Sequence, residues 1–345
     1  MLMDVHTNIP LKNYLTMRLG GPARFMVEIH RPEDVRTVCQ NAQKQQVATW
    51  VLGGGSNVIA GDEGFGGIVL RIRIPGFDII EDNSSSTTIK IGAGEIWDDI
   101  VKRSVDMGLS GIEAMSGIPG TAGATPVQNV GAYGQEIADT FESLEAYDIA
   151  NDEMATLSYD QCKFSYRDSI FRGEWAGRFV ITSITLKLSK NLPQPPFYEG
   201  LQKIFDERNV TVYTAQIIRD TVLEIRREKL PDPKEFPNTG SFFKNAIVDK
   251  WHVDEIRTKY PEMPAYEMAE GQYKVPTGWL IEQTGLKGQT LHGMRVNDKN
   301  ALVLINDSAT CYNDLSMARD EIISAVHFKF GILIEQEPLE ITREQ

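Results

Sequence analysis

The sequence has few of the residues that build disulfide-rich or metal-binding proteins. Its 345 residues include three cysteines, Cys39, Cys162 and Cys311, which lie far apart with no pairing pattern. This usage indicates reduced thiols and a cytoplasmic location. The five histidines show no spacing typical of metal ligands. We therefore expect no metal site.

The sequence also lacks an excess of basic residues and a long apolar run. It has 35 basic and 48 acidic residues, for a net charge of -13. This balance argues against a nucleic-acid partner but permits a local basic pocket for a phosphorylated small molecule. No run approaches the roughly 18 apolar residues of a membrane helix, and residues 1–10 do not resemble a signal peptide. We expect no membrane partner.

The composition is that of a globular chain, with 41% hydrophobic and 24% charged residues. A usual size of about 150 residues per domain predicts at least two domains. The first 75 residues predict a βαβ unit, with strands at 24–29, 49–52 and 67–72. The helix between the first two strands has Pro32 in its first turn. Its buried stripe follows helical spacing: Val35, Val38, Cys39 and Ala42.

Hydrophobic periodicity predicts further helices and strands along the rest of the chain. We expect helices at 96–107, 214–229, 248–260, 277–284 and 312–328. We expect strands at 78–82, 88–91, 143–149, 179–188, 301–305 and 332–334. Gly108 is a suitable left-handed cap for the first of these helices. The proline-rich segment 191–196 is expected to be extended.

A glycine triplet follows the second predicted strand, in the run Gly53, Gly54, Gly55, Ser56 and Asn57. Such a run lets several backbone N–H groups converge on one point, which suits a pyrophosphate. A plain tight turn is the alternative interpretation. The chain contains no Walker motif and no complete Gly-x-Gly-x-x-Gly fingerprint, so we expect neither a Walker kinase nor a Rossmann dehydrogenase.

Residues 116–134 form a second, longer glycine-rich stretch. A loop of this length in a compact domain is typical of ligand binding. Its polar side chains Thr125, Gln128 and Asn129 suit hydrogen bonds to a planar heterocycle or a ribose. An irregular surface connection is the alternative.

Three polar clusters have both a structural and a functional interpretation. Arg167 is either part of a structural ion pair or a cation for an anionic substrate. Ser241 lacks the Gly-x-Ser-x-Gly elbow of hydrolases, so it is a turn residue or part of a polar pocket with residues 242–245. Glu335 and Glu337 end a predicted strand, and a period of two places both on one face, in solvent or in a site.

Seven segments, in this order, resemble those of one family: residues 53–57, 117–133, 166–169, 229–233, 240–245, 278–283 with 287–288, and 331–337. The chain resembles the UDP-N-acetylenolpyruvoylglucosamine reductase family, flavoenzymes of bacterial peptidoglycan precursor synthesis. The region around Tyr198 is similar to that of the longer subtype, which has an extra tyrosine loop.

The resemblance implies an α+β fold with three parts. An FAD-binding fold of the vanillyl-alcohol-oxidase type would occupy two lobes, at 1–75 (with 335–345) and at 76–225. A C-terminal α/β substrate-binding domain would occupy 226–334. The resemblance also implies FAD bound without a covalent link, since no histidine lies in either glycine loop. The expected oligomeric state is a monomer.

The implied reaction makes the chain a UDP-N-acetylmuramate dehydrogenase with NADPH as co-substrate. NADPH reduces FAD, and the enolpyruvyl sugar nucleotide then replaces the nicotinamide. Hydride passes from flavin N5 to the methylene carbon of the enol ether. The resulting negative charge needs cationic or hydrogen-bonding groups, and the neighbouring carbon then needs a proton.

The resemblance assigns three catalytic residues. Ser241 would donate the proton, and Arg167 and Glu337 would stabilise the intermediate. A carboxylate beside developing negative charge is unfavourable, so Glu337 would act as a protonated acid. Glu335 lies two residues away, but the register from Gly331 favours Glu337.

The resemblance also assigns binding residues. Those for FAD would be Gly53, Gly54, Gly55, Ser56, Asn57, Ile118, Gly120, Gly123, Ala124, Thr125, Gln128 and Asn129. Those for the substrate would be Tyr133, Tyr198, Lys229, Asn245, Tyr266 and Lys287, with the two lysines meeting its diphosphate or carboxylate.

Two other functions stay open from the sequence. One is an oxidase of the same fold that acts on a sugar or hydroxy acid. The other is a non-catalytic sensor of FAD or a nucleotide. Bleaching of the flavin by NADPH separates the first from the reductase, and insensitivity to Ser241→Ala separates the second.

Overall fold

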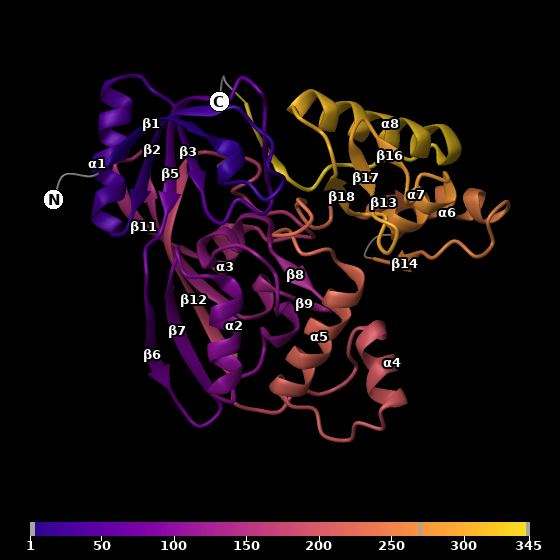
Figure 1. Cartoon of the computed structure of the whole chain (residues 1–345). Coiled ribbons are helices and arrows are strands. Elements are labelled where there is room, and N and C mark those ends of the chain that lie inside the picture. Colours follow the sequence, from indigo (N-terminus) through magenta and orange to yellow (C-terminus); the bar gives the residue numbers. More distant parts are fainter. Residues whose placement is uncertain (1–3, 269–270, 343–345) are drawn as a thin grey trace.

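The computed structural model describes residues 4–268 and 271–342 (Figure 1). The outermost positions of the predicted first lobe, 1–3 and 343–345, lie outside the described residues, as do positions 269–270 of the predicted substrate domain. Two sheets occupy the left side of Figure 1, and a smaller group of helices and short strands, β13 to β18 with α6 to α8, lies on the upper right.

The first sheet confirms the predicted βαβ unit. Strands β2 (Pro22–Ile29) and β3 (Thr49–Leu52) both pair in parallel with β5 (Phe65–Ile72), and helix α1 (Pro32–Lys44) buries the predicted stripe. The chain end returns to this part of the molecule, where β19 (Leu339–Ile341) pairs in parallel with β4 (Val58–Ala60). The sheet strands, in spatial order, are β1 (Val5–Pro10), β2 (Pro22–Ile29), β5 (Phe65–Ile72) and β3 (Thr49–Leu52).

The second sheet is antiparallel throughout and shares its core with the first. Val27 and Ile29 of β2 belong to the same buried cluster as Leu144 and Ile184 of the second sheet. Helix α2 (Trp97–Asp106) ends before Gly108, whose φ of +75° is the predicted left-handed conformation. The strands, in spatial order, are β11 (Glu153–Ser158), β10 (Phe141–Asp148), β12 (Phe179–Ser189), β7 (Ser86–Gly92) and β6 (Phe77–Asp82).

Helices α4 (Glu199–Glu207) and α5 (Ala215–Lys229) pack through Leu201, Phe205 and Val222. Thr214 caps α5, since its hydroxyl accepts from the Ile217 N–H at 3.2 Å. Helix α5 was predicted from its apolar stripe, whereas α4 and β11 were not. Short elements complete this region: α3 (Tyr159–Cys162), β8 (Gly131–Ala132) and β9 (Gln135–Glu136).

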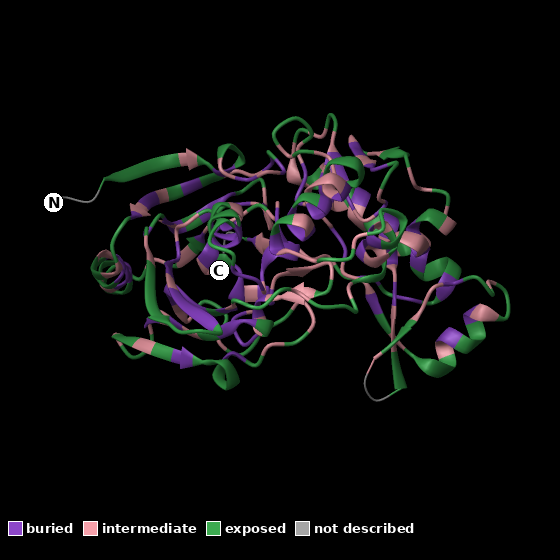
Figure 2. Ribbon diagram, turned by 90° about the horizontal axis from the view of Figure 1, so that it is seen from below, coloured by how far each residue is buried: buried purple, intermediate pink, exposed green. Residues whose placement is uncertain are grey.

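The C-terminal part has its own buried cluster, which also takes in Met17 and Leu19 from the start of the chain. In Figure 2 the buried residues, in purple, lie mainly on strands and helices inside the molecule, and the exposed ones, in green, lie on its outer parts, which include the strand next to the N-terminus. No described helix is both long and apolar enough to cross a bilayer. The elements are β13 (Ala246–Asp249), α6 (Lys250–Arg257), β14 (Tyr266–Glu267), β15 (Gln272–Val275), α7 (Thr277–Gln283), β16 (Thr290–Leu291), β17 (Met294–Val296), β18 (Leu304–Asn306) and α8 (Tyr312–Phe330).

Three predicted elements of this part are corrected. The helix expected at 248–260 starts at Lys250, because residues 246–249 pair with β15 as strand β13. The strand expected at 301–305 begins at Leu304, after a turn in which the Val303 N–H donates to the Asn300 carbonyl. Residues 332–334 form no strand, and the bridge nearest to them in the sequence is an isolated one between Phe243 and Gln336.

Candidate active site

A cavity of about 1420 Å³ is lined by segments that are far apart in the sequence. Pockets for small molecules usually measure roughly 300–1,000 Å³, so this one has room for a large cofactor together with a substrate. Its lining residues come from within the segments 49–58, 118–139, 166–181, 198–199, 226–245, 266–276, 300–302 and 336–340, together with Ile72, Ala93 and Trp97.

The two glycine loops lie against each other on one side of the cavity. A Cβ atom on Gly54 would come within 2.7 Å of Gly120 Cα, and one on Gly53 would come within 2.5 Å of Thr121 Oγ1. Ser56 joins the loops, since its hydroxyl donates to the Pro119 carbonyl at 2.9 Å. The loops therefore present bare backbone to the cavity, as close approach of a pyrophosphate requires.

The second loop is held by its own polar side chains. The Thr125 hydroxyl donates to the Ala122 carbonyl at 2.7 Å. The Asn129 side chain is fully buried, donating to the Ser165 carbonyl and accepting from the Ala138 N–H, both at 3.1 Å. Asn129 does not line the cavity. Because its amide is already engaged, the side chain has a structural role within the loop, and a contact between Asn129 and the cofactor stays a prediction.

Ser241 reaches the cavity from a tight turn. Gly240 adopts φ +72° and donates its N–H to Asn238 Oδ1 at 2.7 Å. The next two residues, Phe242 and Phe243, are buried in the C-terminal core. The Ser241 hydroxyl makes no hydrogen bond with any described residue, so it is free to meet a ligand.

Glu337 lies on a segment that is hydrogen-bonded to the residues after Ser241. The Glu337 N–H donates to the Phe242 carbonyl at 2.8 Å, and the Lys244 N–H donates to the Glu335 carbonyl at 2.9 Å. The Glu337 side chain is 13% exposed and lines the cavity, whereas that of Glu335 is 76% exposed. The two side chains therefore differ in burial, and only that of Glu337 lines the cavity; that both lie on one face stays a prediction.

Arg167 lies beside the Glu337 carboxyl. Its Nε is 3.6 Å from Glu337 Oε1, and its Nη2 donates to the Gly131 carbonyl at 2.5 Å. Gln128 Nε2 donates to the same Oε1 atom at 3.2 Å. Burial raises the pKa of Glu337, although Arg167 and the nearby cations Arg172 and Lys244 oppose this. A raised pKa favours the neutral acid.

The predicted substrate residues line the cavity, with one exception. The Tyr133 and Tyr198 rings meet edge to face, with centroids 5.9 Å apart. Asn245 Nδ2 donates to the Tyr166 hydroxyl at 3.3 Å. The exception is Lys287, which does not line the cavity and pairs with Glu282 at 2.9 Å. The lining residues of this set are Tyr133, Tyr198, Lys229, Asn245 and Tyr266.

Sequence reasoning missed three cations that line the cavity: Arg172, Arg226 and Lys274. Arg226 precedes Lys229 by three residues on α5, so helical spacing predicts that the two share a face. Burial lowers the pKa of Arg226, and the neighbouring Tyr133 opposes that shift. Nothing in the sequence around Arg172 or Lys274 indicated that they would reach the cavity.

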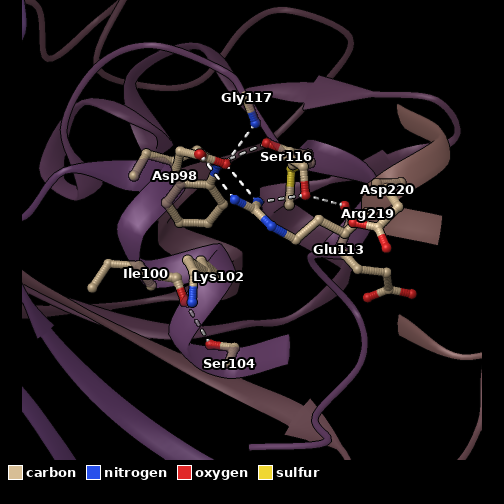
Figure 3. Close-up of polar contacts among 12 residues, drawn as sticks. Asp98, Ile100, Lys102, Ser104, Glu113, Ser116, Gly117, Arg219 and Asp220 are labelled. Carbon is tan, nitrogen blue, oxygen red and sulfur yellow. Dashed lines mark hydrogen bonds and ion pairs between the residues drawn. The ribbon is translucent and has the colours of Figure 1, made fainter. Parts of the chain in front are cut away.

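Arg219 of helix α5 forms an ion pair with Asp98 of helix α2, next to the start of the second glycine loop (Figure 3). Arg219 holds Asp98 with two hydrogen bonds, at 2.6 and 3.0 Å, and also donates to the Ser116 hydroxyl at 2.9 Å. The Gly117 N–H donates to Asp98 at 2.7 Å. The start of the glycine loop is thereby fixed relative to the helix that ends at Lys229.

Comparisons with known proteins agree with this geometry. The family model of an FAD binding domain matches residues 23–158, and that of the UDP-N-acetylenolpyruvoylglucosamine reductase C-terminal domain matches residues 232–341. The reductase of that name from Ralstonia nicotianae is 39% identical over 99% of both chains. The Flavobacterium johnsoniae reductase is 38% identical over 97% of this chain and 99% of its own.

The chain belongs to the UDP-N-acetylenolpyruvoylglucosamine reductase family. Its members are FAD-dependent oxidoreductases, so the family resemblance and the enzyme class expected from the sequence are confirmed. The reductase structure from Thermus caldophilus has the same fold, with a TM-score of 0.67 and 22% identity over 98% of this chain and 99% of that one.

The predicted α+β fold of the vanillyl-alcohol-oxidase type is also confirmed. A 6-hydroxy-D-nicotine oxidase structure from Arthrobacter nicotinovorans matches with a TM-score of 0.54 and 16% identity, over 96% of this chain and 87% of that one.

The lining residues fit FAD. The two glycine loops bring backbone groups to the cavity where no side chain blocks close approach, which suits the pyrophosphate of FAD. No histidine is among the described lining residues, which is consistent with non-covalent binding.

Proposed function

We propose that this enzyme uses NADPH to reduce the enolpyruvyl group of UDP-N-acetylglucosamine enolpyruvate, giving UDP-N-acetylmuramate for peptidoglycan synthesis. The observation that carries the proposal is the meeting of Arg167, Ser241 and Glu337 in one cavity beside two glycine loops. The names of its relatives, which match over almost their full length, support the same substrate.

Each of the three residues has a distinct part in this proposal. When bound, FAD accepts hydride from NADPH and supplies hydride to the methylene carbon of the enol ether. The Arg167 guanidinium is fixed by the Gly131 carbonyl and stabilises the negative charge that develops beside the substrate carboxylate. Glu337 assists as a neutral acid, which its raised pKa supports. Ser241 gives its hydroxyl proton to the second carbon.

The sugar nucleotide then extends toward the end of helix α5. Lys229 lines the cavity there and has no ion pair with a described residue, so we assign it to the diphosphate. Tyr133, Tyr198, Asn245 and Tyr266 contact the rest of the sugar nucleotide. Lys287 has no part in the proposal, because its ammonium group pairs with Glu282 outside the lining.

We also propose the three-part division at 1–75 (with 335–345), 76–225 and 226–334. The return of β19 to β4 supports the assignment of the chain end to the first lobe. The low cysteine content supports a cytoplasmic enzyme. A monomer remains our expectation.

The decisive experiment is turnover of the purified protein with NADPH and the enolpyruvyl sugar nucleotide, followed through the flavin absorbance. We expect NADPH to bleach the flavin and the sugar nucleotide to restore its colour without oxygen. A flavin that ignores NADPH but is reduced by an alcohol substrate would indicate the oxidase instead. A colourless protein would refute both.

A further inference from the structure

Arg172 lies beside Glu337 without touching its carboxyl group. Its Nη1 donates to the main-chain carbonyl of Glu337 and to Gln128 Oε1, both at 3.0 Å. A guanidinium has donors only, so each group that it meets here must be an acceptor. The atom of the Gln128 amide that faces Arg172 is therefore its oxygen.

The Gln128 amide has one orientation that satisfies its neighbours. Its Oε1 accepts from Arg172, and Asn57 Nδ2 donates to the same oxygen at 2.5 Å. The Asn57 amide has both a donor and an acceptor end and can turn over, whereas Arg172 cannot change from donor to acceptor. With Oε1 held by Arg172, the Gln128 NH₂ group faces Glu337 Oε1 at 3.2 Å.

This orientation decides which oxygen of Glu337 carries the proton of the neutral acid. Oε1 accepts from Gln128 and faces Arg167 Nε at 3.6 Å, so a proton there would meet two donors. The proton belongs on Oε2, which has no hydrogen-bond partner among the described residues. The charged groups that face this carboxyl are Arg167, Arg172 and Lys244, and all three favour the carboxylate against the effect of burial.

We propose that Arg172 is a positioning residue, which acts through Gln128 to make Oε1 of Glu337 an acceptor and to leave the proton on Oε2 for the substrate. The inference rests on the proposed function, because that reaction gives a neutral Glu337 its part. Arg172 itself is not assigned a contact with the substrate.

The first test separates the two half-reactions in a stopped-flow experiment on the holoenzyme. Arg172→Met should slow reoxidation of the flavin by the sugar nucleotide about 10-fold, the cost of losing one oriented hydrogen bond. It should also move the alkaline limit of that step to higher pH, because a cation that favours the Glu337 carboxylate is gone. Arg172→Lys, which keeps a charge and a donor, should recover most of the rate and restore the limit.

Flavin reduction by NADPH is the internal control, since it does not use the Glu337 proton. We expect it to change by no more than about twofold in either variant. An equal loss in both half-reactions would overturn the inference, because it would mean that Arg172 merely supports the flavin site.

The second test is a double-mutant cycle with Gln128→Leu. If Arg172 acts through Gln128, the double variant should reoxidise about as slowly as the slower single variant. If the fold-loss in the reoxidation rate of the double variant equals the product of the two single losses, the two residues act independently, which would contradict the inference.

A third measurement needs no turnover and so separates this inference from the proposed function. The melting temperatures of the Arg172→Met protein with and without Glu337→Gln are compared across pH. The two melting temperatures should diverge over a higher pH range than those of the matching pair of proteins that keep Arg172. An unchanged pH range would contradict the inference. If the unsubstituted enzyme fails to turn over, the proposed function is refuted, while this comparison still reports on the contact.

Discussion

The cavity has two walls of different construction. The glycine wall, residues 53–57 and 118–125, is mainly backbone from two loops that pack within contact distance of each other. The charged wall, Arg167, Arg172, Lys229 and Glu337 with the Ser241 hydroxyl, consists of side chains from four separate stretches of the chain. A wall of backbone can be specified by a short run of residue types, whereas a wall of side chains depends on how distant segments meet.

The charged wall should be the more sensitive of the two to loss of a single reactive group. We expect Ser241→Ala to lower the rate of flavin reoxidation by the sugar nucleotide about 1,000-fold, within the range for a general acid. That factor corresponds to about 4 kcal/mol in the barrier. Flavin reduction by NADPH should be unchanged, since the Ser241 hydroxyl holds no other part of the protein. Stopped-flow absorbance of each half-reaction gives both rates.

Ser241→Cys provides a companion variant of similar size that can still carry a proton. Its rate of flavin reoxidation should lie between those of Ser241→Ala and the unsubstituted enzyme. If Ser241→Ala reoxidises at the unsubstituted rate, Ser241 is not the proton donor of the reaction.

The Arg219–Asp98 pair joins helix α5, which ends at Lys229, to helix α2 and the start of the second glycine loop, so its loss should affect the whole protein. Arg219→Met leaves Asp98 without its partner, and breaking one side of a buried pair costs about 3 kcal/mol. The Asp98 side chain is 34% exposed, which favours the lower end of the usual range. Urea unfolding measures the loss.

Arg227→Met is the matched control, because Arg227 lies on the same helix and is exposed. We expect it to change the free energy of unfolding by less than about 0.5 kcal/mol. Equal changes in the free energy of unfolding for the two substitutions would mean that the Arg219–Asp98 pair does not contribute to stability.

How far each wall could be predicted from the sequence follows from its construction. The glycine wall was found as two runs of glycine, and the strands and helix before it followed from periodicity. Arg172 was missed because it acts through contacts with Gln128 and Glu337, which are 44 and 165 residues away. Asn129 was assigned to the cofactor from its residue type and from the family resemblance, and only the tertiary structure shows that its amide is used within the loop.

Gly54 of the glycine wall has no space for a side chain. Gly54→Ala places a Cβ atom 2.7 Å from the Gly120 backbone, which cannot move aside as a flexible side chain can. Overpacking of this kind costs about 2 kcal/mol, so we expect FAD affinity to fall about 30-fold as the loops separate. Flavin fluorescence during titration of the apoprotein measures the affinity.

Gly173→Ala is the control for Gly54→Ala, since a Cβ atom there meets nothing within 4 Å. It should retain the unsubstituted FAD affinity. Retention of full affinity by Gly54→Ala would show that the loops separate without cost and that close packing is not what makes this wall.

The smallest expected effect concerns Glu337 in the charged wall and depends on pH. Because the folded protein raises the pKa of Glu337, folding favours its protonated form, and stability falls as the pH rises from the unfolded pKa through the folded one. Glu337→Gln removes that loss. Its melting temperature relative to the unsubstituted protein should therefore increase with pH above about 4.3 and level off once the folded group has ionised. Glu335→Gln, two residues away and exposed, should show no such trend. A falling difference for Glu337→Gln would mean that the cations of the charged wall outweigh burial and that Glu337 is held as a carboxylate.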